Sequence, residues 1–255
     1  MNHNVFQVVE SELARWQDAG FTPKLWLRDD DATRPTAALE HLLTITGDLE
    51  MPLLLAVIPK MAGSALAERL AELPLVTPAV HGYAHSNHAP AGEKSVELID
   101  TPAREAGAVL AELRAGIDKL DRLFGARLST ILVPPWNRVS PSVALRIPDL
   151  GFSAISVFGW TRTSAPLPHV NTHVDVMNWR GGRVGHDLET ICGVLAARFG
   201  EARLRGGVPI GLLTHHLAHD TTAWSGLGAI LEWIRLDGRI TVCDAETAMQ
   251  AGAQA

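Results

Sequence analysis

Residues 25–31, Leu-Trp-Leu-Arg-Asp-Asp-Asp, are a short apolar run that ends abruptly in charges. An apolar run of this length, bounded by polar residues, is typical of a buried strand. Pro35 then occupies a position typical of the first turn of a helix, and a helical pattern continues to about Leu49. The stretch therefore predicts a strand and a helix, with three carboxylates where the strand ends.

The same alternation of strand and helix recurs along the chain. Further strands are predicted over residues 53–58, 76–80, 130–133, 152–157, 169–177, 209–213 and 239–242. Further helices are predicted over residues 64–72, 101–124, 187–199 and 224–236, from residue 140, and after Asp244. Such alternation is typical of parallel strands covered by helices. We expect an α/β fold, a distorted (β/α) barrel of seven to eight parallel strands in one domain over residues 1–255, with a doubly wound open sheet as the alternative.

The composition narrows the function classes. Of the 255 residues, 47% are apolar and 20% are charged, which argues against a disordered chain. The net charge of −6 argues against a nucleic-acid-binding protein. The two cysteines, Cys192 and Cys243, cannot form a disulfide framework or a thiolate metal site. No glycine-rich nucleotide fingerprint follows a strand. Because residues 1–20 carry charges and no long apolar stretch occurs, we expect a cytoplasmic protein without a membrane partner.

Polar clusters follow four of the predicted strands, at residues 28–31, 81–88, 134–138 and 214–220. Six of the eleven histidines lie in two of these segments. In barrels of this type, functional side chains lie at the carboxyl ends of the strands. The clustering of histidines therefore predicts a functional site at the carboxyl ends of these strands.

The most specific pattern is His81-x-x-x-His85, because a spacing of four brings both imidazoles to one face of a helical turn. Three adjacent carboxylates repel one another, and a nearby cation would relieve that repulsion. By itself the triplet could also be a solvated turn that caps the next helix. Together, the two histidines and one aspartate predict a metal site with open coordination positions, which is typical of a catalytic metal.

Other candidates are less specific. Trp136 follows two prolines, so its ring could stack on a sugar or simply cover the barrel rim. His215 directly follows a buried strand and suits general acid or base chemistry near neutral pH. Asp175 and Trp179 are candidates for lining a substrate pocket. His169-x-x-x-His173 lies in a strand-like stretch without acids, and we expect it to be structural.

These motifs, in this order from Leu25 to Asp220, resemble the polysaccharide deacetylase family, the NodB-homology group of carbohydrate esterases. In that family an Asp-Asp pair provides a base and a metal ligand, a His-x-x-x-His motif provides two ligands, and a proline-rich loop and a Leu-x-His motif follow. The resemblance implies that Asp30 is the base, that Asp31, His81 and His85 bind the metal, and that His215 is the acid. A register one residue earlier would make Asp29 the base and Asp30 the ligand.

The chain also departs from the family pattern. Gly82 follows the first histidine where the family has Ser or Thr, and Arg138 follows the proline loop instead of preceding it. Arg138 is a candidate for binding substrate, and either Arg28 or Arg138 is a candidate for keeping Asp30 ionised. These departures indicate a divergent member, whose substrate need not be a polysaccharide.

The resemblance implies a metal-dependent deacetylase that hydrolyses the acetyl amide of an N-acetylated sugar or glycan precursor. The expected cofactor is a divalent metal, Zn²⁺ first, with Co²⁺ or Mn²⁺ as alternatives. The expected partner is a small-molecule or oligosaccharide substrate. Two further hypotheses are a hydrolase of a non-sugar C–N bond in a small cytoplasmic substrate and a non-catalytic sugar-binding protein.

Overall fold

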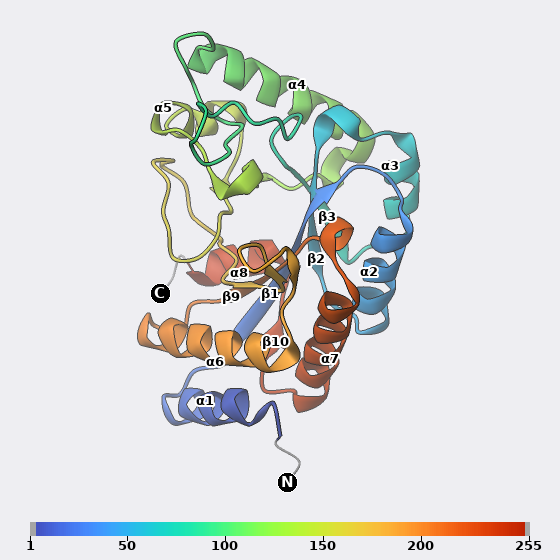
Figure 1. Ribbon diagram of the computed structural model, residues 1–255, viewed down its shortest axis with the longest axis vertical. Helices are drawn as coiled ribbons and strands as arrows, with labels where there is room; N and C mark the ends of the chain where they lie inside the picture. The colour runs from blue at the N-terminus through green and yellow to red at the C-terminus, as the bar shows by residue number, and fades with distance from the viewer. Residues whose placement is uncertain (1–3, 253–255) are drawn as a thin grey trace. The chain divides into compact units, whose positions relative to one another are not determined.

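The computed structural model describes residues 4–252, which form two compact units that share one strand (Figure 1). The first unit contains the described residues up to Asp29, Ala37–Leu53, and the chain from Thr172 onward. The second contains Asp30–Thr36 and Leu54–Asn171. Strand β1 (Lys24–Ala32) belongs to both, because the boundary falls within its acidic triplet.

In the first unit, β1 pairs in parallel with β9 (Ile210–Thr214) and β10 (Thr241–Val242), and β9 pairs with β6 (Val174–Asp175). The short strands β7 (Met177–Asn178) and β8 (Val184–Gly185) form a separate antiparallel hairpin. The helices of this unit are α1 (Gln7–Asp18), α2 (Ala37–Asp48), α6 (Leu188–Leu204), α7 (Thr221–Asp237) and α8 (Ala245–Gly252). Helix α1 packs on α6, where the Trp16 indole donates a hydrogen bond to the Phe199 carbonyl at 3.0 Å (Figure 1).

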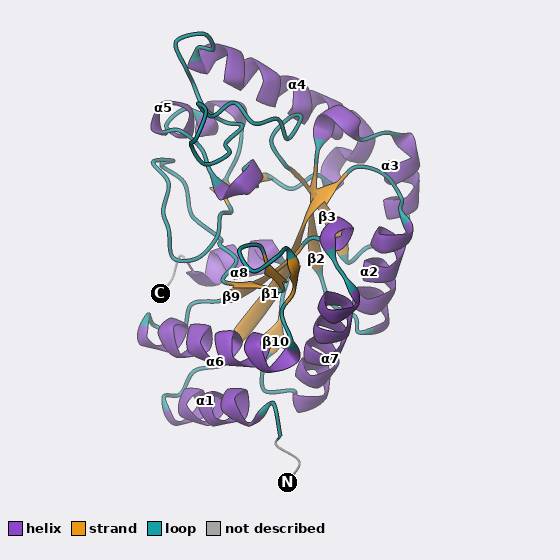
Figure 2. Ribbon diagram, viewed as in Figure 1, coloured by secondary structure: helices purple, strands orange, loops and turns teal. Residues whose placement is uncertain are grey.

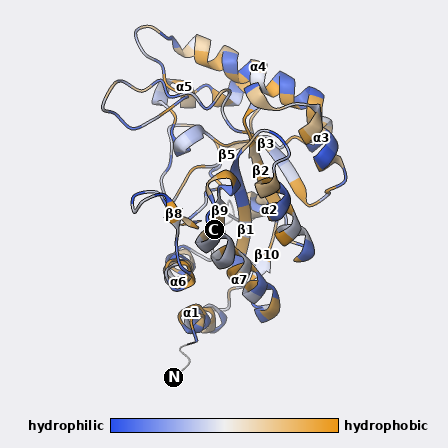
Figure 3. Cartoon of the chain, turned by 45° about the vertical axis from the view of Figure 1, so that its right-hand side comes forward, coloured by the Kyte–Doolittle hydropathy of each residue, from blue (hydrophilic) through white to orange (hydrophobic). Residues whose placement is uncertain are grey.

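In the second unit, the strand order β5-β4-β3-β2 leads to the end of β1. These strands are β2 (Leu53–Val57), β3 (Val76–Val80), β4 (Ile131–Leu132) and β5 (Ala154–Ile155), drawn in orange in Figure 2. The helices are α3 (Ser64–Ala71), α4 (Ala106–Phe124) and α5 (Pro141–Ala144). Helix α4 carries both apolar and polar residues (Figure 3), and its buried Val109, Leu113, Gly116 and Leu120 recur at the three- and four-residue spacing of one helix face.

The structure confirms the predicted fold class, α/β with seven to eight parallel strands of the distorted (β/α) barrel type: eight of the described strands belong to one sheet. The pairs whose register is known in that sheet are parallel. Within residues 4–252, no helix combines the length and apolar content needed to cross a membrane.

Several predicted boundaries are wrong, among them the following three. The helix predicted from residue 101 begins at Ala106, because Thr101 and Arg104 instead exchange two backbone hydrogen bonds. The helix predicted to end at Gly200 continues to Leu204. The long strand predicted over 169–177 is an isolated bridge at His169 followed by β6 and β7.

Candidate metal centre

Asp31, His81 and His85 come together in the second unit. Asp31 is near the end of β1, His81 directly follows β3, and His85 lies four residues further along the same loop. Oδ1 of Asp31 is 3.2 Å from Nε2 of each histidine. One ligand atom from each residue lies within 4.8 Å of the other two, and no other such cluster of acids, histidines or cysteines occurs within residues 4–252.

The second ring nitrogen of His81 determines how this ring faces the cluster. Nδ1 lies 2.9 Å from the backbone carbonyl of Val133, and a carbonyl can only accept, so Nδ1 carries the proton. A neutral ring presents an Nε2 lone pair to the Asp31 carboxylate and could bind a cation there, whereas a protonated ring donates a hydrogen bond from Nε2 to Oδ1 of Asp31. Burial acts to lower the pKa of His81, but the carboxylates of Asp30 and Asp31 hold this pKa above its usual value.

His85 completes the cluster from a strained position. Its φ of 55° lies in the left-handed region, and its ring packs on Trp136 with 4.2 Å between the ring centroids. Burial lowers the pKa of His85, and the neighbouring His81 adds to this effect, although Asp31 acts to raise the pKa. The lowered pKa favours the neutral imidazole, which is the form that binds a metal.

Gly82, one of the departures from the family pattern, has a geometric reason. Its φ is 61°, and a Cβ atom there would lie 2.0 Å from Oε2 of Glu97 and 2.6 Å from Cγ of Pro135. No residue other than glycine fits this position without movement of its neighbours. The loop between the two histidines is therefore built around Glu97, a residue that sequence reasoning missed.

The three aspartates at the end of β1 have different surroundings. Asp29 is completely buried, and its carboxylate accepts hydrogen bonds from the Thr214 hydroxyl (2.6 Å), the His216 backbone N–H (2.9 Å) and Nδ1 of His216 (2.5 Å). Burial acts to raise the pKa of Asp29, but His216 holds this pKa below its usual value. Asp30 is also buried, at 2% exposure, and its charge acts on His81. Because Asp29 is engaged by three donors, this arrangement favours the register in which Asp30 and Asp31 serve the site.

In the first unit, three predicted residues lie together. The Trp179 indole N–H donates to Oδ2 of Asp175 at 2.8 Å, and the Trp179 ring meets the His215 ring edge-on with 4.7 Å between centroids. The guanidinium of Arg183 lies 5.4 Å from the centroid of the Trp179 ring. Asp175 therefore fixes the tryptophan beside the histidine that we predicted to be the acid.

The remaining predicted residues have other neighbours. Trp136 lies against His85, with a left-handed φ of 53°. Nη1 of Arg138 donates to the Ser95 carbonyl at 2.9 Å, and Arg28 is completely buried in β1. The choice between Arg28 and Arg138 as the partner of Asp30 stays open.

The second His-x-x-x-His pair has the structural contacts expected of it. Nε2 of His169 accepts from the Thr163 N–H at 2.9 Å, and Nδ1 of His173 accepts from the Gly211 N–H at 3.2 Å. Burial, aided by the cation of Arg198, lowers the pKa of His173 to about 3. His173 is therefore a neutral buried residue.

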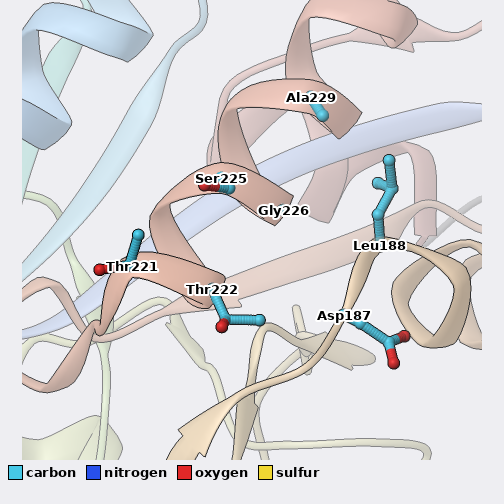
Figure 4. A pocket seen from close by; sticks show the side chains of 7 residues that line it. All are labelled: Asp187, Leu188, Thr221, Thr222, Ser225, Gly226 and Ala229. Carbon is cyan, nitrogen blue, oxygen red and sulfur yellow. The ribbon is translucent and has the colours of Figure 1, made fainter.

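A shallow pocket of about 430 Å³ lies in the first unit between the N-termini of α6 and α7 (Figure 4). Its polar lining residues are Asp187, Thr221, Thr222 and Ser225. Asp187 already caps α6 through the Thr190 N–H. None of the predicted site residues lines this pocket.

The sequence matches no protein-family model and no curated protein. Solved structures of similar fold nevertheless cover most of the chain. A Mycobacterium smegmatis protein assigned as a polysaccharide deacetylase has a TM-score of 0.66 and 15% identity over 91% of this chain and 92% of its own. The peptidoglycan deacetylase PdaC from Bacillus subtilis has a TM-score of 0.58 and 12% identity, over 91% and 93%.

A third structure, a family 4 acetyl xylan esterase from Clostridium thermocellum in complex with a cobalt ion, has a TM-score of 0.53 and 14% identity, over 89% of this chain and 90% of its own. Identities this low establish the fold and not the activity. The chain thus has the fold of the polysaccharide deacetylases of carbohydrate esterase family 4, as the resemblance in its sequence predicts.

Proposed function

We propose that the protein is a divalent-metal-dependent hydrolase that removes an acetyl group from an N-acetylated sugar or glycan precursor. The observation that carries the proposal is the Asp31–His81–His85 cluster, with two Nε2 atoms 3.2 Å from one carboxylate oxygen, on a fold shared with deacetylases. A cytoplasmic location remains part of the proposal.

The donor set fits the proposed metal. One carboxylate and two imidazoles are typical ligands of Zn²⁺, Co²⁺ or Mn²⁺, and they leave open positions for water and substrate. The bond from Nδ1 of His81 to Val133 is the outer contact that orients a metal-binding imidazole. A metal bound here would polarise the acetyl carbonyl and lower the pKa of a water molecule.

The protein's own residues would move the protons. In the proposed reaction, Asp30 accepts the proton of the attacking water, and His215 donates a proton to the leaving amine, which would otherwise depart as an unstable anion. Trp136, Arg138, Asp175 and Trp179 would contact the substrate. The family resemblance supports these roles, and the fixed position of Trp179 beside His215 is compatible with them.

Acetate release from N-acetylglucosamine oligomers, measured with Zn²⁺-, Co²⁺- and Mn²⁺-loaded protein, tests the proposal. We expect His81→Ala to lose both metal and turnover. Asp30→Asn should keep the metal and lose about 10²–10⁴-fold in turnover, the usual contribution of a general base. Full activity in either variant would contradict the assignment.

A second candidate keeps the metal and changes the substrate to a non-sugar C–N bond in a small molecule. The observation that favours it is the departure of the site from the family pattern at Gly82 and Arg138, with Arg138 bonded to the Ser95 carbonyl. A panel of N-acetylated sugars and cyclic amides separates the two candidates. Tight sugar binding without turnover under every metal would instead indicate a non-catalytic binding protein.

A further inference from the structure

Glu97 is a completely buried carboxylate that the proposed reaction does not use. Its Oε2 accepts a hydrogen bond from the backbone N–H of Tyr83 at 3.1 Å. Its Oε1 accepts from the N–H groups of Ala84, at 2.7 Å, and Ser86, at 3.3 Å. A carboxylate is costly to bury unless hydrogen bonds compensate it, and here one loop provides all three of these donors.

That loop is the one that carries His81 and His85. The three N–H donors lie between the two histidines and directly after the second. The loop contains two left-handed residues, Gly82 at φ 61° and His85 at φ 55°, a conformation that a non-glycine residue rarely adopts unless its surroundings fix it. Three backbone N–H groups that converge on one anion fix such a turn.

Glu97 is itself held in place. Nη1 of Arg104 donates to the carbonyls of Glu97, at 2.9 Å, and Ile99, at 3.0 Å. The other end of the same guanidinium pairs with Glu112, which lies on α4. A chain of contacts thus runs from α4 through Arg104 to the Glu97 backbone, and from the Glu97 carboxylate to the histidine loop.

We propose that Glu97 is a positioning residue of the metal centre, whose carboxylate holds residues 81–86 in the conformation that presents both histidine Nε2 atoms to one cation. The ligand pair is then preformed before the metal binds. This inference rests on the proposed metal-dependent function, and it assigns to Glu97 no contact with metal or substrate.

Glu97→Gln tests the proposal, because it replaces one carboxylate oxygen by an amide NH₂. The NH₂ group cannot accept a hydrogen bond from the backbone N–H groups that face it. We expect the Zn²⁺ dissociation constant, measured by competition with a chromophoric chelator, to rise about 10–100-fold, as for other residues that orient metal ligands. The absorption spectrum of the Co²⁺-loaded variant should differ from that of the wild type. A folded variant with unchanged affinity and spectrum would overturn the proposal.

Glu12→Gln is the matched control. Glu12 is also a buried glutamate, but it lies in the first unit and bonds Arg203 at 2.8 Å and Arg15 at 3.0 Å. We expect this variant to lose stability and to keep its Zn²⁺ affinity. An equal loss of affinity in both variants would mean that Glu97 acts only through general stability, which would also overturn the proposal.

Hydrogen exchange in the metal-free wild type provides a test that does not depend on any variant folding. The amides of Tyr83, Ala84 and Ser86 should be protected before Zn²⁺ is added. Exchange at the rate of an unstructured chain, with protection only after Zn²⁺ is added, would show that the metal and not Glu97 orders the loop. If the wild type binds no metal, the proposed function is wrong. If the wild type and Glu97→Gln bind metal equally tightly, only the role proposed for Glu97 is wrong.

Discussion

Three consecutive aspartates end β1, and each has its own environment. Asp29 is completely buried with Thr214 and His216, Asp30 is buried near His81, and Asp31 has a side chain 30% exposed beside two imidazoles. Side chains of a strand alternate in direction, so consecutive aspartates have different surroundings. Two assignments of base and ligand were left open by the sequence, Asp30 with Asp31 and Asp29 with Asp30. Replacing each aspartate in turn and measuring metal binding distinguishes them.

Asp29→Asn and Asp31→Asn should have opposite effects. Removing one partner of a buried ion pair costs about 3–5 kcal/mol, so Asp29→Asn should lower the free energy of unfolding by that amount and leave Zn²⁺ affinity intact. Asp31→Asn should weaken Zn²⁺ binding at least tenfold with little loss of stability, because its side chain is partly exposed. Urea unfolding and metal competition measure both. Loss of turnover in Asp29→Asn with metal and stability retained, together with unchanged Zn²⁺ affinity in Asp31→Asn, would establish the earlier register.

His173 makes stability depend on pH. Its folded-state pKa of about 3 lies below the value of about 6.5 expected in the unfolded chain. Below pH 6.5 the unfolded chain therefore binds a proton that the folded protein does not, and stability falls as the pH falls. At pH 5 this residue should cost about 2 kcal/mol relative to pH 7. His173→Asn keeps an acceptor for the Gly211 N–H, and it should flatten the urea-unfolding profile over this range; an unchanged profile would contradict the assignment.

At the scale of elements, the loop after β3 depends on a glycine. Alanine at Gly82 would combine a left-handed φ with contacts of 2.0 Å to Glu97 and 2.6 Å to Pro135. We expect Gly82→Ala to lose Zn²⁺ affinity by more than tenfold. Gly125→Ala is the matched control, because Gly125 has a φ of 54° but open space around it. If Gly82→Ala and Gly125→Ala bind Zn²⁺ equally well, the close contact of residue 82 with Glu97 does not affect the metal site, and the prediction is wrong.

How much of the site the sequence reveals depends on the kind of partner each residue has. Asp31, His81 and His85 could be predicted, because metal ligands are side chains of restricted type and spacing. Glu97 could not, because its partners are backbone N–H groups, which leave no pattern in the sequence. A lone acid between Val96 and Leu98 was the only signal available.

The same limit applies to the elements. The five-residue strand β3 was predicted at its observed bounds, because an apolar run marks a buried strand. The start of α4 was missed, because Arg104 is committed to the carbonyls of Glu97 and Ile99, contacts that no local pattern encodes.

At the scale of the whole molecule, the chain passes between the two units several times, and β1 contributes residues to both. Neither unit is one continuous segment, and the single domain over residues 1–255 stays a prediction that cooperative unfolding can test. Some amides exchange only when the whole chain unfolds. If the chain unfolds as one cooperative unit, a bound ligand stabilises it against unfolding and slows the exchange of all these amides equally.

Zn²⁺ binding tests that cooperativity. At a free concentration 100 times its dissociation constant, Zn²⁺ should stabilise the folded state by about 2.7 kcal/mol, so globally exchanging amides should slow about 100-fold. The amides of β3 report on the unit that holds the proposed ligands, and those of β9 report on the other unit. We expect equal slowing in both strands, and at most about 11-fold slowing in Asp31→Asn under the same zinc, because its dissociation constant is at least tenfold higher. Slowing confined to β3 would mean that the two units unfold separately, because only the unit that binds the metal would then gain its energy.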